Sequence, residues 1–237
     1  MKILEIEIQT DNLKETENFY IEILGLQLVS KSDESITLKT GNSKLTFIKS
    51  ENINPKYHFA FNIPNNKLEE ALNWAESKVK LIENEEKSVV ANFESWNANA
   101  IYFYDNNNNI VEFIARHDLE NATEKLFDTS IIESISEIGI VTEKPIELAE
   151  NLIETNGLNY FAKSTKSEKF AALGNDNGLF IIVETNRKWY PTEQKAERHY
   201  SKVKIEIDDI IKELALNENK SAGNSTYTTT GETTRTF

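Results

Sequence analysis

The sequence predicts an α+β fold made of repeated strand–helix–strands units. Apolar and polar residues alternate over short segments such as 2–10 and 57–63, as they do in half-buried strands. Polar residues that can cap a helix precede the amphipathic segment 13–24, and a glycine follows it. This order of elements restarts about every 55 residues, which indicates an internal repeat.

The first two predicted units occupy the N-terminal half. In the first unit, Asp11 and Asn12 cap a helix that ends before Gly25, between a long strand and three short ones. Its strands are expected over 2–10, 26–30, 35–39 and 44–49. The second unit has a helix over 67–77, and residues 105–109 (DNNNN) form a turn by composition. Its strands are expected over 57–63, 87–93, 98–105 and 110–115.

Two further units follow a linker over residues 119–134. The third has strands over 135–141, 170–173 and 178–184 and a helix over 145–155. The fourth starts with a strand over 203–207, continues as a helix over 208–216, and then stops short. Residues 217–237 are polar and Thr-rich, which suits a tail or a late hairpin. We therefore expect domains over 1–118 and 135–216, the second of them degenerate and incomplete.

Composition limits the classes of function. The 39 acidic and 26 basic residues give a net charge of −13, which disfavours nucleic acids and anionic membranes as partners. No apolar run approaches the ~20 residues that span a bilayer, and no signal peptide is evident at the start. The chain has no cysteine, so thiolate ligands and nucleophiles are excluded, and we expect a cytoplasmic protein. Its three histidines are His58, His117 and His199.

Three segments, in order and at module spacing, resemble one protein family. They are DNLKETENFYIEILGL (11–26), YHFAF (57–61) and DNNNNIVEF (105–113). Together they resemble the glyoxalase/bleomycin resistance protein/ring-cleaving dioxygenase superfamily, also called vicinal oxygen chelate (VOC) proteins. The resemblance implies paired βαβββ modules that form a bowl of curved sheets around a divalent metal. It is good over residues 1–118 and weakens beyond them, which implies a complete bowl within 1–118.

The resemblance also implies a metal site. Its ligand positions fall on Glu5, His58 and Glu112, where Glu5 replaces a more common histidine. Glu5 or Glu112 would serve as catalytic base. Such an oxygen-rich set favours one divalent ion among Mn, Fe, Ni, Zn and Mg. At the equivalent positions of the third and fourth units stand Glu137 and Lys202, so that half is expected to be structural or a lid.

The alternation of side chains along the strands is consistent with this metal site but leaves alternatives open. It places Glu5 with Glu7 on the polar face of the first strand, and His58 and Glu112 on the faces opposite their apolar neighbours. Glu5 could instead be an exposed carboxylate, and His58 a structural histidine. The substrate pocket is expected to include Glu7, Trp96, Tyr102 and Tyr104, although Trp96 could equally be packing. No arginine falls on a strand position predicted to face the bowl, which makes a phosphonate substrate less attractive.

Two functional classes remain. The first is a metal-dependent lyase, isomerase or dioxygenase that acts on a small oxygenated molecule. The second is a metal-free protein of the bleomycin-resistance type that holds a small-molecule ligand between aromatic walls. A homodimer is compatible with either class. The metal content of the purified protein would discriminate between them.

Overall fold

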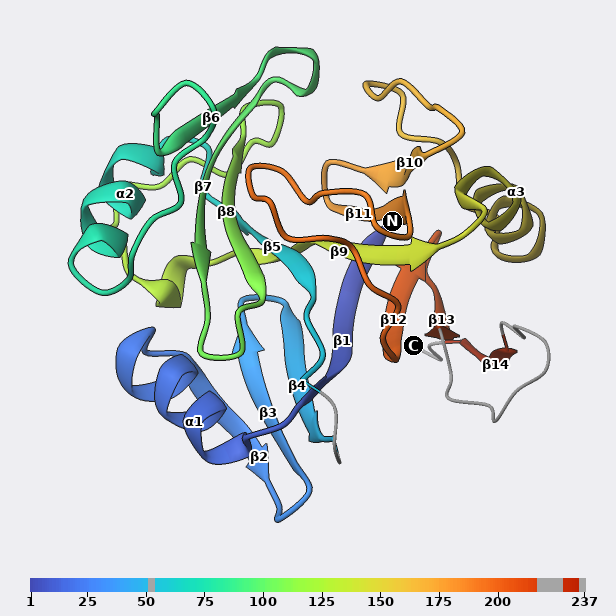
Figure 1. Ribbon diagram of the computed structural model, residues 1–237. Coiled ribbons are helices and arrows are strands. Elements are labelled where there is room, and N and C mark those ends of the chain that lie inside the picture. Colours follow the sequence, from blue (N-terminus) through green and yellow to red (C-terminus); the bar gives the residue numbers. More distant parts are fainter. Residues whose placement is uncertain (51–53, 217–227, 235–237) are drawn as a thin grey trace.

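The computed structural model describes residues 1–50, 54–216 and 228–234, the last range by its backbone alone. These residues form one curved mixed sheet of 14 strands, with three α-helices at its periphery (Figure 1). The predicted α+β class is confirmed. The strands group into four consecutive units, and the position of each unit in the sheet determines where the functional side chains meet.

The first unit follows the predicted order of elements. Asn12 caps α1 by accepting a hydrogen bond from the backbone N–H of Glu15, and the last part of the expected helix is a π-helical turn that ends before Gly25. Gly25 adopts φ +77°, a left-handed conformation that glycine tolerates best. The elements of this unit are β1 (Lys2–Thr10), α1 (Leu13–Glu17), η1 (Asn18–Ile23), β2 (Gln27–Lys31), β3 (Ser35–Thr40) and β4 (Ser43–Lys49).

The second unit repeats this plan. Its first strand, β5, is buried along its whole length, because β8 and β9 pair with its two edges. The predicted turn at 105–109 connects β7 to β8, and its backbone N–H groups at Asn107 and Asn109 donate to the Asp105 carboxylate. The elements are β5 (His58–Ile63), α2 (Leu68–Glu76), β6 (Val90–Phe93), η2 (Glu94–Trp96), β7 (Ala98–Tyr104) and β8 (Ile110–Arg116).

The third unit keeps the pattern, but the fourth has no helix among its described residues. The helix predicted over 208–216 is wrong, because Asp208 and Asp209 both have positive φ and form a tight turn between β12 and β13. Within 217–237, β14 pairs with β13, and the rest of the predicted tail lies outside the described residues. The elements are η3 (Thr129–Ile131), β9 (Ser134–Thr142), α3 (Pro145–Asn156), β10 (Phe170–Asn175), β11 (Gly178–Glu184), β12 (Ser201–Ile207), β13 (Ile210–Leu216) and β14 (Thr228–Thr234).

The units pair across the expected domain boundary. The first strand of the second unit, β5, runs antiparallel to β9 of the third, while β1 runs antiparallel to β12 of the fourth. Figure 1 shows β1 beside β12 at the centre of the sheet. Between these two pairs, β1 and β9 share one bridge, Ile3 to Ile135. The arrangement therefore differs from the bowl expected within residues 1–118: one half consists of units two and three, and the other of units one and four.

The two faces of the second unit's sheet carry different kinds of side chain. Phe59, Phe61 and Phe113 are fully buried on the outer face, where Trp74 of α2 packs against the Phe113 ring. Side chains alternate along a strand, so His58, Ala60 and Glu112 face the concave side. No helix among the described residues is long and apolar enough to cross a membrane.

Candidate metal centre

Three neighbouring strands bring one histidine and two glutamates to the same place on the concave face. Ala60 at the middle of β5 lies beside Glu112 on β8 and beside Glu137 on β9. His58 precedes Ala60 by two residues and therefore points to the same side. The ligand atoms of His58, Glu112 and Glu137 all lie within 4.8 Å of one another.

The hydrogen bonding of His58 fixes its tautomer. Its Nδ1 lies 3.1 Å from the carbonyl oxygen of Ile110, so Nδ1 carries the proton and donates it. The unprotonated Nε2 faces the Glu112 carboxylate, with 3.6 Å between Nε2 and Oε2. Burial lowers the pKa of His58 from 6.5 to about 4, so the ring is neutral at neutral pH. A neutral imidazole with its free nitrogen turned toward two carboxylates is the form that binds metal ions.

Glu112 is buried, and no lysine or arginine of the described residues forms an ion pair with it. Burial raises the pKa of its carboxyl well above the usual range, and the nearby Glu137 carboxylate raises it further. Tyr102, directly opposite on β7, hydrogen-bonds to Glu112 and opposes this shift, as does the charge of Arg116. Glu112 therefore takes up a proton more readily than an ordinary carboxyl group, and a metal ion bound there would compete with that proton.

Arg116 holds the second carboxylate. Its Nη2 forms an ion pair with Glu137, and its Nε donates to Ser136 Oγ at 3.1 Å. The guanidinium is fully buried, and its Nη1 lies 3.6 Å from Asp176 Oδ1. Burial raises the pKa of Glu137, while Arg116 opposes the rise. The ion pair with Arg116 thus orients Glu137 and opposes the rise of its pKa, whereas the described residues give Glu112 no such ion pair with an arginine or lysine.

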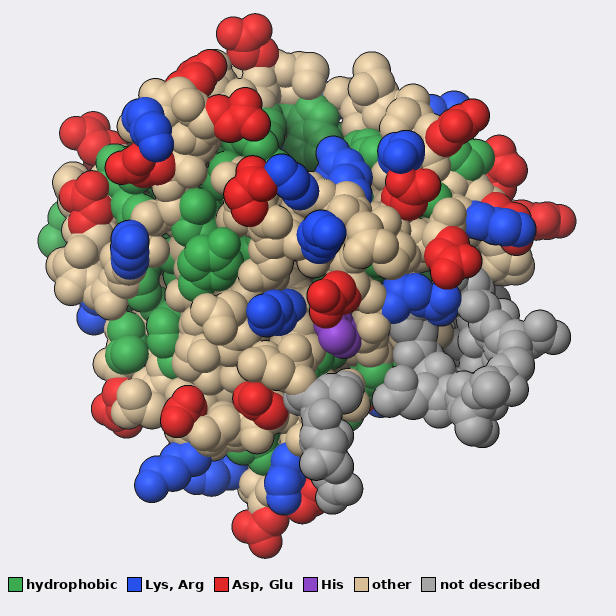
Figure 2. Space-filling model, in the orientation of Figure 1, with side chains coloured by type: hydrophobic (Ala, Val, Ile, Leu, Met, Phe, Trp, Pro, Cys, Tyr) green, Lys and Arg blue, Asp and Glu red, His purple; other side chains and the backbone are tan. Residues whose placement is uncertain are grey.

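An aromatic cavity of about 290 Å³ opens above this cluster. The ring of Trp189 lies 5.1 Å from that of His58, and Tyr190 contacts the ring of Tyr102 edge-on at 5.8 Å. Figure 2 shows a hollow lined by hydrophobic side chains between the top of β8 and β10, with basic side chains at its rim. The cavity is lined by His58, Phe93, Trp96, Tyr102, Glu112, Glu137, Phe170, Ile181, Arg187, Trp189 and Tyr190.

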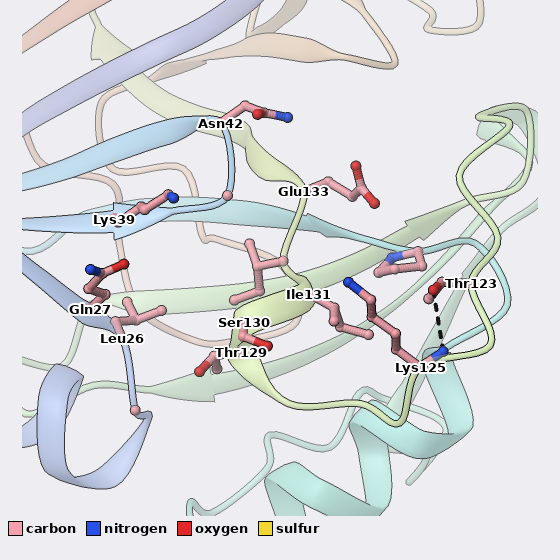
Figure 3. A pocket seen from close by; sticks show the side chains of 14 residues that line it. Leu26, Gln27, Lys39, Asn42, Thr123, Lys125, Thr129, Ser130, Ile131 and Glu133 are labelled. Atoms are coloured by element: carbon pink, nitrogen blue, oxygen red, sulfur yellow. Dashed lines mark hydrogen bonds between the residues drawn. The ribbon is translucent and has the colours of Figure 1, made fainter.

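A larger pocket of about 490 Å³, shown in Figure 3, shares no lining residue with the aromatic cavity. It is formed by the turns before β2 and β4 and by the segment 123–133. Among its described lining residues, Glu133 is the one carboxylate, and there is no histidine. Size alone therefore does not identify the functional site, and the donor set above selects the smaller cavity.

Sequence and fold both connect this site to known proteins. The family model described as Glyoxalase/Bleomycin resistance protein/Dioxygenase superfamily matches residues 2–129, just over half of the chain. The chain belongs to this superfamily. The match includes His58, Glu112 and Arg116, whereas Glu137 lies beyond its end. No curated protein sequence matches the chain.

Solved structures of the superfamily share the fold over most of the chain. A candidate dioxygenase from Bacillus subtilis covers 91% of this chain and 81% of its own, with a TM-score of 0.60 and 14% identity. Glyoxalase I from Zea mays covers 82% of this chain and 70% of its own, with a TM-score of 0.53 and 15% identity. A single-residue variant of that maize enzyme covers 91% of this chain and 89% of its own, with a TM-score of 0.56 and 12% identity. At these identities the likeness shows the fold alone.

Of the three ligand positions that the superfamily resemblance implies, the structure brings His58 and Glu112 together. Glu5 lies elsewhere: its Oε1 accepts a hydrogen bond from Thr46 at 2.7 Å, and its backbone pairs with β4 and β12. The ligand set expected from sequence therefore differs from the cluster found, because β5 pairs with β9 and not with β1. Glu137 occupies the place that was assigned to Glu5.

The residues expected to line the substrate pocket divide in the same way. Trp96 and Tyr102 line the cavity. Tyr104 is exposed and is not part of the lining, and Glu7 lies in the other half, where it accepts a hydrogen bond from Tyr200 at 2.6 Å. His117 Nε2 donates a hydrogen bond to Asn99 Oδ1 at 2.8 Å, outside the cavity.

Several residues of the site were missed from sequence. Glu137 was identified as the equivalent of a ligand position but was assigned to a degenerate half. Arg187 and Trp189 follow β11 in a segment without a predicted element, so no periodicity indicated their direction. Arg116, the last residue of β8, lies on the same side of the strand as Glu112 and pairs with Glu137, so the expectation that no strand arginine faces the bowl is wrong. Arg187 reaches the cavity from a loop, which that expectation did not cover.

Proposed function

We propose that this protein is a divalent-metal-dependent enzyme of the lyase, isomerase or dioxygenase type that acts on a small oxygenated molecule. The observation that carries the proposal is the convergence of His58, Glu112 and Glu137 within 4.8 Å at the buried floor of an aromatic cavity. In this proposal the third ligand is Glu137, in place of Glu5, which the sequence analysis had put there. Membership of the superfamily supports it.

The donor set suits a divalent ion. Two carboxylates balance the charge of such an ion, and the imidazole presents its unprotonated nitrogen. Carboxylate oxygens with one imidazole favour hard or borderline metals, so Mn, Fe, Ni, Zn and Mg all remain candidates. Three protein ligands leave coordination positions for water or for a substrate oxygen.

The protein residues have distinct roles in this proposal. When bound, the metal would supply Lewis acidity to a substrate oxygen. Glu112 is the group that takes up and returns a proton, at Oε2, because its pKa is raised and no cation pairs with it. Glu137 is held as a carboxylate by Arg116 and orients the site. The rings of Trp189 and Tyr102 exclude water and position a flat substrate.

A metal-free binding protein is the second candidate, and the Arg116–Glu137 ion pair favours it. That pair already neutralises one of the two carboxylates, so the cavity is complete as an aromatic pocket without an ion. The raised pKa of Glu112 also favours a metal-free cavity, because a protonated carboxyl group is neutral and needs no cation beside it.

Metal binding to the full-length protein separates the two candidates. Calorimetric titration with Mn, Ni and Zn after chelator treatment should give one site per chain. We expect His58→Ala and Glu137→Gln each to weaken binding by at least about tenfold. The matched control is Glu5→Gln, which should leave binding unchanged. Absence of binding in the wild-type protein, or its loss in Glu5→Gln alone, would refute the site.

A further inference from the structure

The loop that follows β11 folds as a short hairpin over the cavity. The backbone N–H of Asn186 donates to Ala196 at 2.8 Å, that of Ala196 donates back to Arg187 at 2.8 Å, and that of Trp189 donates to Gln194 at 2.9 Å. Neighbouring residues in such an extended segment point to opposite sides. Arg187 and Trp189 accordingly line the cavity, while Lys188 lies outside it, where it pairs with Glu193. The position of Arg187 is thus fixed by backbone hydrogen bonds.

Arg187 is the cation of the cavity that no acid neutralises. It is half-buried, and its guanidinium stacks on the ring of Phe170 with 5.2 Å to the centroid. No ion pair or side-chain hydrogen bond joins it to another described residue. Burial lowers its pKa, because the half-buried guanidinium has lost part of its hydration.

The other charges near the cavity are matched. Arg116 pairs with Glu137 and lies near Asp176, while Lys163 bridges Asp176 and Asp118 at 2.7 and 2.6 Å. The charges of these two cations and three carboxylates, together with those of an ionised Glu112 and a divalent ion at the floor of the cavity, sum to zero. Arg187 then leaves the cavity with a single positive charge, in a chain whose net charge is −13. A bound ligand with one negative charge would complete the balance.

We infer that Arg187 anchors the carboxylate of the substrate, and that the substrate is an organic acid with a flat aromatic body. This inference rests on the proposed function, because the opposite end of the molecule would meet the metal centre. One guanidinium offers the paired N–H donors that match one carboxylate, whereas a phosphate dianion calls for more positive charge. The rings of Trp96, Tyr102 and Trp189 enclose the space between the two ends.

Arg187 is a specificity residue in this account, and a charge-matched pair of probes tests it. Phenylacetate and its neutral isostere phenylacetamide would be titrated into the full-length protein, with binding followed by ligand-observed NMR. In the wild-type protein the acid should bind at least about tenfold more tightly than the amide. Arg187→Gln should remove this preference by weakening the acid alone, and Arg187→Lys should retain part of it.

Lys188→Gln is the matched control, since it removes the adjacent cation that lies outside the cavity; the preference should persist. Thermal unfolding of each variant establishes that the fold is intact. Equal binding of acid and amide by the wild-type protein, including no saturable binding of either, overturns the inference. A preference for phenylacetate over phenylacetamide that persists in Arg187→Gln would also overturn it. So would tighter binding of phenylphosphonate than of phenylacetate, if Arg187→Gln removed that difference.

Metal titration of the same variants separates this inference from the proposed function. Arg187→Gln should bind metal as the wild-type protein does, because Arg187 is not among the ligands. If the wild-type protein binds no metal but prefers the acid, the proposed function fails while the carboxylate anchor stands. If it binds metal and shows no preference for the acid, the anchor fails alone.

Discussion

At the scale of single residues, the contact between Trp189 and His58 depends on a glycine. Gly139 lies two residues after Glu137 on β9, beneath the Trp189 ring. A Cβ atom at this position would lie 2.5 Å from Trp189 Cη2 and 3.2 Å from the carbonyl oxygen of His58. The absence of a side chain at 139 therefore allows the indole to close one wall of the cavity.

The first prediction is that Gly139→Ala displaces Trp189. Relieving this overlap should lower the free energy of unfolding by about 1–3 kcal/mol and change the tryptophan fluorescence. Combining the change with Trp189→Phe should recover part of the loss, because the smaller ring can shift away. Chemical denaturation of the two single variants and the double variant measures this coupling. Additive losses would contradict the steric account.

The second prediction concerns the buried Arg116–Glu137 pair. Arg116→Met leaves the Glu137 carboxylate buried without its partner and should destabilise the fold by about 3–5 kcal/mol. Arg116→Met with Glu137→Gln should be less destabilised than the single variant, since no isolated charge remains. The matched control is Lys169→Met, which breaks an exposed pair with Glu184 and should cost less than about 1 kcal/mol. Equal effects of the two single changes would refute the buried-pair interpretation.

At the scale of elements, two turns set the register of the strands beside them. The turn between β7 and β8 is organised by Asp105, whose Oδ2 accepts hydrogen bonds from Tyr20 and from the side chain of Asn109, both at 2.7 Å. This contact also joins the first unit to the second. The register it sets places Tyr102 opposite Glu112.

The third prediction is a pH dependence that comes from this turn. Burial raises the pKa of Asp105 from 3.8 to about 6, despite its hydrogen-bond donors. Between these two values the folded state holds a proton that the unfolded state has lost. The free energy of unfolding should therefore rise, by about 1 kcal/mol, as the pH falls from 7 to 5.

Urea denaturation at both pH values measures this increment. Asp105→Asn has no titrating group at 105, so its increment should be smaller than that of the wild-type protein by about the same 1 kcal/mol. The other carboxyl groups are common to both proteins and cancel in the comparison. An identical increment in the two proteins would show that Asp105 does not titrate in this range.

The fourth prediction concerns the turn between β12 and β13. Asp208 and Asp209 have φ values of 49° and 63°, a conformation that glycine adopts without strain. Asp209→Gly should therefore stabilise the protein by about 0.5–1 kcal/mol, as measured by thermal unfolding. Asp33→Gly, in the turn between β2 and β3, lacks a positive φ to relieve and should give no gain. Equal effects at both positions would contradict the explanation.

Local patterns in the sequence predict most of these elements but not their partners. Alternation over 57–63 correctly indicates β5, and Asn12 correctly marks the start of α1. The segment 208–216 was misread as a helix because its apolar residues fit either period and its turn needs no glycine. Sequence analysis placed Glu137 at the position equivalent to Glu5, yet the candidate site depends on β9 pairing with β5. That pairing joins residues far apart in the chain, and no local pattern encodes it.

At the scale of the whole molecule, the two halves are structurally equivalent but chemically different. Glu7 on β1 lies beside Thr46 and Lys202, just as Ala60 on β5 lies beside Glu112 and Glu137. The equivalents of His58, Glu112 and Glu137 are therefore Glu5, Thr46 and Lys202. The sequence analysis expected the degenerate half over residues 135–216, whereas the half of the described sheet that lacks the His58 cluster consists of units one and four. Its Glu7 pairs with Lys202 at 3.5 Å, where the other half has its metal-ligand cluster.

The fifth prediction is that a second metal site can be built by this equivalence. The triple variant Glu5→His, Thr46→Glu and Lys202→Glu places the same donor set in the other half. Metal stoichiometry by calorimetry should rise from one to two per chain, with weaker binding at the new site because position 202 is more exposed. The double variant that retains Lys202 should stay at one, since the ammonium opposes a cation. A triple variant that also stays at one would refute the equivalence.

The pairing of β1 with β12 also has a consequence for how the chain is made. One edge of β1 pairs with β4, which follows soon in the chain. Its other edge pairs with β12, which the ribosome makes about 200 residues after β1. At cellular rates of elongation this interval lasts about 10–40 s. Units two and three can complete their half during that time, whereas the free edge of β1 must be shielded. A nascent chain that ends before residue 201 therefore exposes an unpaired edge of β1, which is a site for aggregation.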